Sequence, residues 1–461
     1  DKESRNEKTK QLPGKKHRKV LSFHHNLHCM QKYLLLLFLT IYSALYTKAH
    51  EDTTLSTVKT SAIENNYFLP ADIHIYIDTF NHASVNNIKT SDFIHLEQLP
   101  GKKVPKKFMI DGYVYILFKL ENNEQATRSF YFTPGVFVRK LTLYKRNANS
   151  GSWQAIGQEK QNTNQLAYHH FSTDAGSSLQ ILAKVKFAKT NIILLKPYLI
   201  NENMFDYHIN FIHTHWFGLD IVTYIISGIL LMMLLFSLVN YFQNRKREFL
   251  YYSIYALCMA VLLSLKAILY KSSTGFNFFN EEYLDYALQI IGYIFYVGFT
   301  RMFLNTPSNY PVLNKLFIAA EVILGVSLAA FTFCYFTNTP YPLLSRIENF
   351  SKLFMIFLGI AYLILGILQR NKLMNYLLAG NVANLLMGGI SQYMILVPSS
   401  NLFPASGLFR QSLFYFEVGL LLELILFLAG LVYKNKMELI EKIKMDEELK
   451  LQKERQQYEQ E

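Results

Sequence analysis

Residues 238–257 read LVNYFQNRKREFLYYSIYAL. This stretch ends one apolar segment, passes through the cations Arg245, Lys246 and Arg247, and enters a second apolar segment. A helix needs about 20 mainly apolar residues to cross a bilayer. Outward from this stretch, seven segments have that length and character, and they cover residues 217–239, 250–270, 283–304, 312–336, 350–369, 373–397 and 411–433. The sequence therefore predicts a transmembrane domain of seven helices within residues 213–433.

The composition is that of a membrane protein. Of the 461 residues, 51% are hydrophobic and 17% are charged, whereas soluble domains carry about 25% charged residues. The net charge of +12 does not indicate a nucleic-acid partner, because residues 1–32 hold nine Lys or Arg against three acids and supply half of it. We expect membrane lipid, and no nucleic acid, among the partners.

The cations between the predicted spans gather on one side of the membrane. The loops on that side carry Arg245, Lys246, Arg247, Arg301, Lys315, Arg370, Lys372, Lys434 and Lys436. The loops on the other side carry Lys271, Arg346, Lys352 and Arg410. Because cytoplasmic loops are enriched in Lys and Arg, we expect a multi-pass protein of the cell inner membrane with its C-terminus in the cytoplasm. The region before the first span would then lie in the periplasm or outside the cell.

The N-terminal region has the pattern of an export signal. Within residues 30–49, Lys32 precedes an apolar run that is too short to span a membrane comfortably. The segment ends in Thr47-Lys48-Ala49, a small-x-small pattern. We expect a signal peptide cleaved after Ala49. Residues 1–29 are expected to be an upstream or disordered basic leader.

Residues 50–212 show a period of two. YVYILFKL (113–120) places Val114, Ile116, Phe118 and Leu120 on one face, and LQILAKVKF (179–187) alternates in the same way. Turn-forming clusters such as RNANSGS separate these runs. The pattern predicts an all-β sandwich of the jelly-roll type. No cysteine falls in this region, so we expect no disulfide in it.

Three sandwich residues are candidates for a ligand platform. The side chains of Arg139, Tyr144 and Trp153 could hold a sugar, although packing or loop anchoring explains the same residues. In VFVRKLTLY (136–144) the alternation slips near Arg139, which predicts a β-bulge. The histidine pairs at residues 169–170 and 213–215 have no further ligands at suitable spacing, so no metal site is predicted. No cofactor motif is present either.

Six polar residues fall inside the predicted spans. They are Lys266, Glu321, Asn381, Asn384, Glu417 and Glu423. Charges in a membrane are costly and usually paired. Lys266 and Glu417 each lie 16 residues from the cytoplasmic end of their span, so their equal depth predicts an ion pair between the second and seventh helices. Glu321 and Glu423 lie close to the depth of the two asparagines and are expected to be unpaired. The network either joins helices or acts as a switch.

The chain leaves the last span through KMELIEKIKMDEELKLQKERQQYEQE (436–461). This segment is rich in good helix formers, and it predicts a cytoplasmic helical connector over residues 434–461. Its own apolar residues give no clean heptad over three repeats. Because one helix could not bury them alone, we expect a coiled coil in a homodimer.

The order of sandwich, seven spans and helical connector resembles the bacterial seven-transmembrane receptors with diverse intracellular signalling modules, the 7TMR-DISM family. The resemblance covers roughly residues 55–461. The stretch beginning YVYILFKLENN is similar to that family's type-2 extracellular domain, a jelly roll likened to carbohydrate-binding modules. The family's aromatic-led strand often reads Trp-x-Arg-Phe, and the matching residues here are Tyr115-Ile116-Leu117-Phe118.

The resemblance implies a bacterial sensory receptor and not an enzyme. Tyr115 would join the platform for a small extracytoplasmic ligand, with carbohydrate as the candidate class. The seven helices would pass the signal to the connector and to a cytoplasmic partner. We expect that partner to be a two-component output module such as a histidine kinase, encoded beyond residue 461 or in a separate chain. The alternative is a transporter or channel that uses the intramembrane acids as a pathway.

Overall fold

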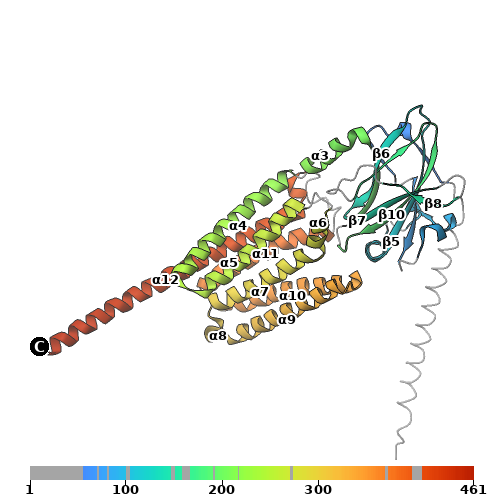
Figure 1. Cartoon of the computed structure of the whole chain (residues 1–461). Coiled ribbons are helices and arrows are strands. Elements are labelled where there is room, and N and C mark those ends of the chain that lie inside the picture. Colours follow the sequence, from blue (N-terminus) through green and yellow to red (C-terminus); the bar gives the residue numbers. More distant parts are fainter. Residues whose placement is uncertain are drawn as a thin grey trace, which may run out of the picture.

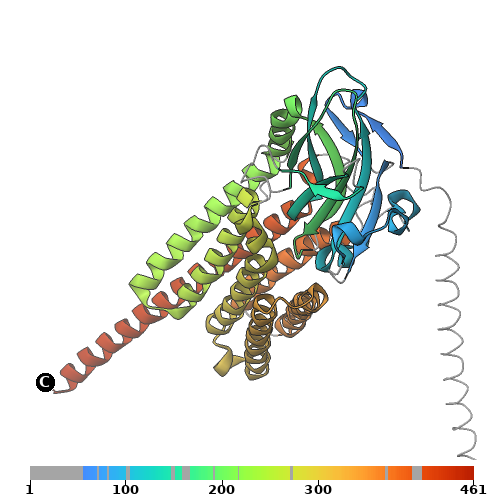
Figure 2. The same cartoon turned by 45° about the vertical axis from the view of Figure 1, so that its right-hand side comes forward.

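The computed structural model describes residues 55–69, 72–79, 83–99, 104–146, 151–157, 167–190, 193–215, 217–269, 274–368, 372–396 and 407–460. The predicted leader and signal peptide, residues 1–49, lie outside these ranges. A β-rich domain is followed by a bundle of long helices. The β domain and the free end of the last helix lie at opposite ends of the bundle (Figures 1 and 2).

The described part of the β domain consists of two sheets. The first is seven-stranded, with the order β4-β3-β5-β10-β7-β8, and β1 pairs with β5. Its strands are β1 (Thr57–Lys59), β3 (His74–Asp78), β4 (Ile94–His95), β5 (Tyr113–Glu121), β7 (Val138–Arg146), β8 (Trp153–Ala155) and β10 (Ser178–Phe187). The second sheet has the order β2-β11-β6-β9, with β2 (Asn66–Phe68), β6 (Arg128–Val136), β9 (His169–Thr173) and β11 (Leu194–Asn201). All pairings are antiparallel except that of β1 with β5.

The alternating pattern of the sequence forms the core between these sheets. Val114, Ile116 and Phe118 on β5 are fully buried in one cluster, together with Phe132 from the second sheet. The rings of Phe118 and Phe132 stack with centroids 5.2 Å apart. The prediction of a β domain is therefore confirmed, as two mainly antiparallel sheets, whereas the jelly-roll type stays a prediction. Short helices complete it: η1 (Thr60–Ala62), η3 (Val85–Asn87), η4 (Thr90–Asp92), η5 (Leu96–Gln98), α2 (Lys106–Asp111) and η7 (Glu202–Met204).

The bundle contains a helix at each of the seven predicted spans. They are α4 (Phe217–Asn244), α5 (Arg247–Leu269), α7 (Asp285–Phe303), α9 (Pro311–Phe336), α10 (Tyr341–Ile367), α11 (Lys372–Leu396) and α12 (Ser412–Gln460). Shorter helices are α3 (Phe205–His215), α6 (Gly275–Phe279), η8 (Asn280–Leu284), α8 (Thr306–Asn309) and η9 (Leu408–Arg410). Among the described residues, six helices are long and apolar enough to cross a membrane, and α7 is the one of the seven that falls short. Ten residues of α7 are buried among its neighbours, so it needs less apolar surface than a helix that faces lipid.

The last helix extends far beyond the others. α12 begins at Ser412, packs mainly against α11, and continues without a break to Gln460. Its final part projects away from the bundle (Figure 1). The predicted helical connector is thus the direct continuation of the seventh span.

Candidate functional site

An ion pair between Arg139 of the β domain and Glu282 of the bundle joins the two domains, with Nη1 of Arg139 contacting both carboxylate oxygens. The Arg139 guanidinium lies 3.0 Å from Oε1 and 2.9 Å from Oε2 of Glu282. The Glu282 side chain is only 1% exposed, whereas that of Arg139 is 50% exposed. Charge-assisted hydrogen bonds of this kind are stronger than neutral ones. The contact therefore ties strand β7 to the segment that enters the third span.

A β-bulge directs Arg139 toward this border. The pairing of β10 with β7 shifts between Lys186 and Phe187, so that Arg139 is left without an opposite residue. Phe137, two residues earlier, adopts a left-handed φ of 59°. The predicted bulge is confirmed. Arg139 is engaged with Glu282 at the border, and its grouping with Tyr144 and Trp153 in a ligand platform stays a prediction.

Further contacts reinforce the same border. The Lys189 amide donates to Glu282 Oε1 at 2.9 Å, and its ammonium donates to the Thr339 carbonyl at 3.3 Å. The Tyr341 amide donates to Asp111 Oδ1 at 2.9 Å. Phe278 and Tyr341 are buried in the same cluster as the sandwich core. Ionic and apolar contacts thus join the two domains at the end of α6, at η8 and at the start of α10.

Glu282 lies in an unusual turn of helix. It belongs to η8, a π-helical segment between α6 and α7 whose flanking residues keep helical dihedral angles. The helix therefore runs from Gly275 to Phe303 with one widened turn. Such π-turns are rare and often occur at functional sites. The residue that contacts the sandwich is thus part of the same helix that crosses the bundle.

The other end of this helix contacts α12. Phe427 of α12 packs against Tyr296 and Phe299 of α7, with ring centroids 5.6 Å apart in each case. About two turns further along α12, the Lys434 ammonium donates to the Phe303 carbonyl at 2.9 Å. A continuous set of contacts therefore runs from strand β7 through α7 to the helix that leaves the bundle.

A cluster of charged and polar side chains holds α12 where it leaves the bundle. Lys434 forms an ion pair with Glu248 at 3.1 Å. Lys246 donates to Asn435 Oδ1 at 2.8 Å and pairs with Glu438. These five residues, called here the tail-end collar, join α12 to the turn between α4 and α5. Lys246 and Lys434 stood in the sequence as loop cations and Glu438 as an acid of the connector, but nothing in the sequence indicated their pairing.

The predicted ion pair between Lys266 and Glu417 is wrong. Lys266 pairs with Asp285 of α7 at 3.2 Å. Glu417 instead accepts a 2.5 Å hydrogen bond from the Thr223 hydroxyl of α4. The prediction rested on the equal distance of the two residues from the cytoplasmic ends of their helices. Each of them has a nearer partner on another helix, Asp285 of α7 for Lys266 and Thr223 of α4 for Glu417. Asp285 was missed because it stands at the start of a span.

The other intramembrane acids also have partners. Glu321 forms a 2.6 Å ion pair with Arg301, which corrects the expectation that it is unpaired. Glu423 accepts hydrogen bonds from the Tyr255 hydroxyl at 2.8 Å and from the Asn384 amide at 2.9 Å, so it too has partners. These two bonds link α12 to α5 and α11.

Asn381 does not share this cluster with Asn384. Its amide donates to the Gly359 carbonyl of α10 at 3.3 Å. The six predicted residues therefore do not form one network: Glu423 joins α12 to α5 and α11, and the other contacts are separate from it.

The aromatic candidates of the sandwich lie on the outer face of the large sheet. Tyr144 and Trp153 are half-buried and pack against a cluster that contains Tyr115. Tyr115 itself is 0% exposed, and its hydroxyl donates to the Ala83 carbonyl at 3.0 Å. This burial raises the pKa of the Tyr115 hydroxyl. Tyr115 therefore cannot stack on a ligand, and its place in the predicted platform is wrong.

One cation lies beside this outer face. The Lys184 ammonium lies 4.4 Å from the ring centroid of Tyr113 and 5.4 Å from that of Tyr115. Lys184 follows Leu182 on β10, and Leu182 pairs with Tyr144. The half-buried rings of Tyr144 and Trp153 and the ammonium of Lys184 therefore lie on one face of the sheet.

Comparison with known proteins agrees with this architecture. No curated protein matches the chain. Residues 219–434 match the model of the family described as 7TM diverse intracellular signalling. The matched residues extend from α4 to the exit of α12 and include the whole route from Glu282 to Lys434. The membrane domain of the chain, residues 219–434, therefore belongs to the 7TMR-DISM family.

Proposed function

We propose that the protein is a sensory receptor in which the sandwich binds a ligand and α7 passes the response to α12. The observation that carries this proposal is the ion pair of Arg139 with Glu282. It attaches the sandwich to α7, which also packs against Phe427 and contacts Lys434. A shift of β7 would therefore move α7, and α7 would move the exit of α12.

The proposed ligand is a small carbohydrate bound on the outer face of the large sheet. Tyr144 and Trp153 offer half-buried rings there, and Lys184 offers a cation. Rings with an apolar face and a polar edge suit amphipathic ligands such as sugars. This assignment keeps two of the predicted platform residues.

The proposed orientation places the sandwich in the periplasm or outside the cell. The described ends of the helices support it, because Arg245, Arg301 and Lys434 lie at the end of the bundle from which α12 projects. A reporter that works only in the cytoplasm should be active when fused after Lys436. Activity only in a periplasmic reporter at that position would reverse the orientation.

The connector is proposed to act as a homodimer that is read by a cytoplasmic output module such as a histidine kinase. Its residues Leu439 and Ile443 are exposed, and paired copies would cover such side chains. A transporter is not favoured, because the matched family is a receptor family.

The test uses the full chain in lipid nanodiscs and a panel of soluble oligosaccharides. Trp153→Ala and Tyr144→Ala should weaken binding at least tenfold. Tyr198→Ala should not, because Tyr198 lies on the second sheet.

A bound oligosaccharide should also change hydrogen exchange in residues 427–438. Arg139→Ala should keep the binding and abolish that change. Oligosaccharide binding that leaves residues 427–438 unaffected in the unmodified chain would contradict the receptor mechanism.

A further inference from the structure

One face of α12 is exposed both inside and beyond the bundle. Residues on this face are spaced alternately by three and four, and all of them are exposed: Leu422, Ile425, Ala429, Val432, Lys436, Leu439 and Ile443. They are called here the α12 stripe. This spacing is the heptad pattern of a left-handed coiled coil. The stripe is about 30 Å long at 1.5 Å per residue. It is not visible in the connector alone, because most of it precedes residue 436.

The stripe passes through two different environments. Up to Val432 it lies at the depth of the helical bundle, where lipid could cover it. Leu439 and Ile443 lie beyond the tail-end collar, and they are 59% and 49% exposed. Lipid tails cannot cover side chains that lie past the charged residues at the end of a span. An occupant that covers the whole stripe must therefore be a protein helix that continues from membrane to cytoplasm.

We propose that this occupant is α12 of a second copy of the chain, packed in parallel along the stripe. The inference rests on the proposed homodimer and specifies where its interface begins. A second copy has the same stripe at the same depth, so the two would meet in register. In heptad terms Lys436 stands at an a position, where one polar residue fixes register at some cost in stability.

The charges beside the stripe favour this parallel arrangement. Lys442 stands at a g position and Glu447 at the following e position. In a parallel pair, a g residue faces the e residue five positions later on the other helix. Lys442 would therefore face Glu447 of the second copy, and the reverse contact would form by symmetry. An antiparallel pair would instead require the two α12 helices to cross the membrane in opposite directions, with their connectors on opposite sides of it.

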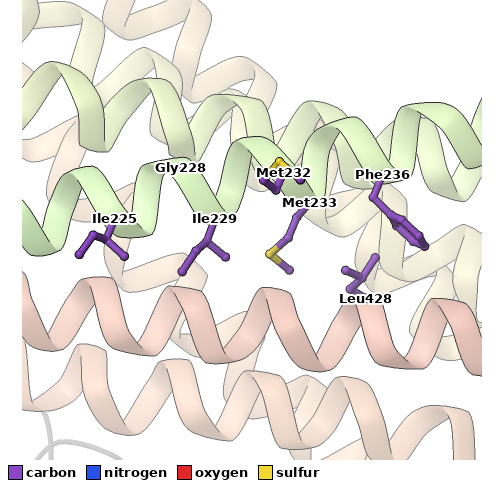
Figure 3. Close-up of a pocket in the computed structure, with 7 residues that line it drawn as sticks. All are labelled: Ile225, Gly228, Ile229, Met232, Met233, Phe236 and Leu428. Atoms are coloured by element: carbon purple, nitrogen blue, oxygen red, sulfur yellow. The ribbon is translucent and has the colours of Figure 1, made fainter.

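A groove beside the stripe gives the second copy room to pack. It lies between α4 and α12, has a volume of about 640 Å³, and is lined by apolar side chains that include Ile225, Met232, Phe236 and Leu428 (Figure 3). Leu428 precedes stripe residue Ala429. Gly228 borders the groove, and a Cβ added there would meet nothing within 4 Å. We expect side chains of the second α12 to fill this groove.

Disulfide crosslinking in native membranes tests the interface. Single cysteines would be placed in a full chain whose own three cysteines are replaced by alanine. The stripe variants are Ile425→Cys, Ala429→Cys, Leu439→Cys and Ile443→Cys. The matched controls are Met445→Cys, on the opposite side of the connector, and Phe333→Cys, an exposed residue of α9. The stripe variants should form dimers at least tenfold faster than either control.

The outcomes separate this inference from the proposed homodimer. Native mass measurement of the full chain in nanodiscs reports the dimer itself. A dimer that crosslinks through Met445, or only through the two connector positions, would overturn the continuous stripe while leaving a homodimer in place. A monomer would overturn both. In addition, Ile443→Asp should lower crosslinking of Leu439→Cys about tenfold, whereas Met445→Asp should leave it unchanged.

Discussion

Removing the Arg139 side chain should loosen the sandwich from the bundle without unfolding either. In Arg139→Ala, Glu282 keeps its hydrogen bond from the Lys189 amide but loses both contacts to the guanidinium. A nearly buried carboxylate then loses the cation that balances its charge. The border should therefore open more often.

The size of the effect follows from the exposure of the two partners. Breaking a buried ion pair by removing one member typically costs about 3–5 kcal/mol. Arg139 is half exposed, and solvent screens such a pair. The Lys189 amide also compensates part of the charge. We therefore expect a loss of about 2 kcal/mol in docking free energy, within the range of about 1.5–3 kcal/mol for hydrogen bonds to charged groups.

Hydrogen exchange at the Lys189 amide measures this loss directly, because that amide is protected by Glu282 itself. A loss of 2 kcal/mol corresponds to about 30-fold faster exchange. Arg146→Ala is the matched control. Arg146 lies on the same strand, and its side chain donates to the Gly151 carbonyl and to the Gln180 side chain, both within the β domain. Glu282→Gln preserves an acceptor for Lys189, so a double-mutant cycle with Arg139→Ala should show coupling. Unchanged exchange in Arg139→Ala, or strictly additive effects, would refute the docking role.

Three further predictions concern the bundle and the sandwich. Glu423→Ala should lower the melting temperature of the full chain more than Glu423→Gln, because each buried donor left unpaired costs about 1–3 kcal/mol; equal melting temperatures would contradict this. The folded yield lost in Lys266→Met should be rescued by Asp285→Leu and not by Glu417→Leu, and the opposite rescue would restore the discarded pairing. Burial lowers the pKa of His169 below its ordinary value of 6.5, so the unfolded chain binds more protons below pH 6.5. Sandwich stability should therefore fall as the pH drops below 6.5, and His169→Asn should flatten a melting profile that otherwise shows this loss.

The sequence predicted those features that depend on repeating patterns. Alternation along 113–120 placed Val114 and Phe118 in the core correctly, because burial on one face of a strand requires a period of two. The slip near Arg139 correctly indicated a bulge, since an extra residue breaks that period. Seven apolar segments likewise gave the number of long helices, because the thickness of a bilayer fixes their length.

Partners that are distant in sequence could not be predicted in this way. Arg139 and Glu282 are separated by 143 positions, and no local pattern connects them. Depth in the membrane placed Lys266 and Glu417 at one level, but it contains no information about which helices are neighbours. The direction in which each helix faces decides the pairing, and that direction is set by packing of the whole bundle.

The unbroken helix α12 can carry a small change of angle at the membrane to a point far from it. From Lys434 to Gln460 it continues for 26 residues, about 39 Å at 1.5 Å per residue. Residues 431–461 contain no Gly or Pro, so there is no residue at which the helix would readily kink. It can therefore act as a lever pivoting at the membrane surface. A tilt of about 5° at Lys434 would displace Gln460 by about 3 Å on this geometry, so a movement too small to disturb packing inside the bundle becomes one that a protein bound at the tip could detect.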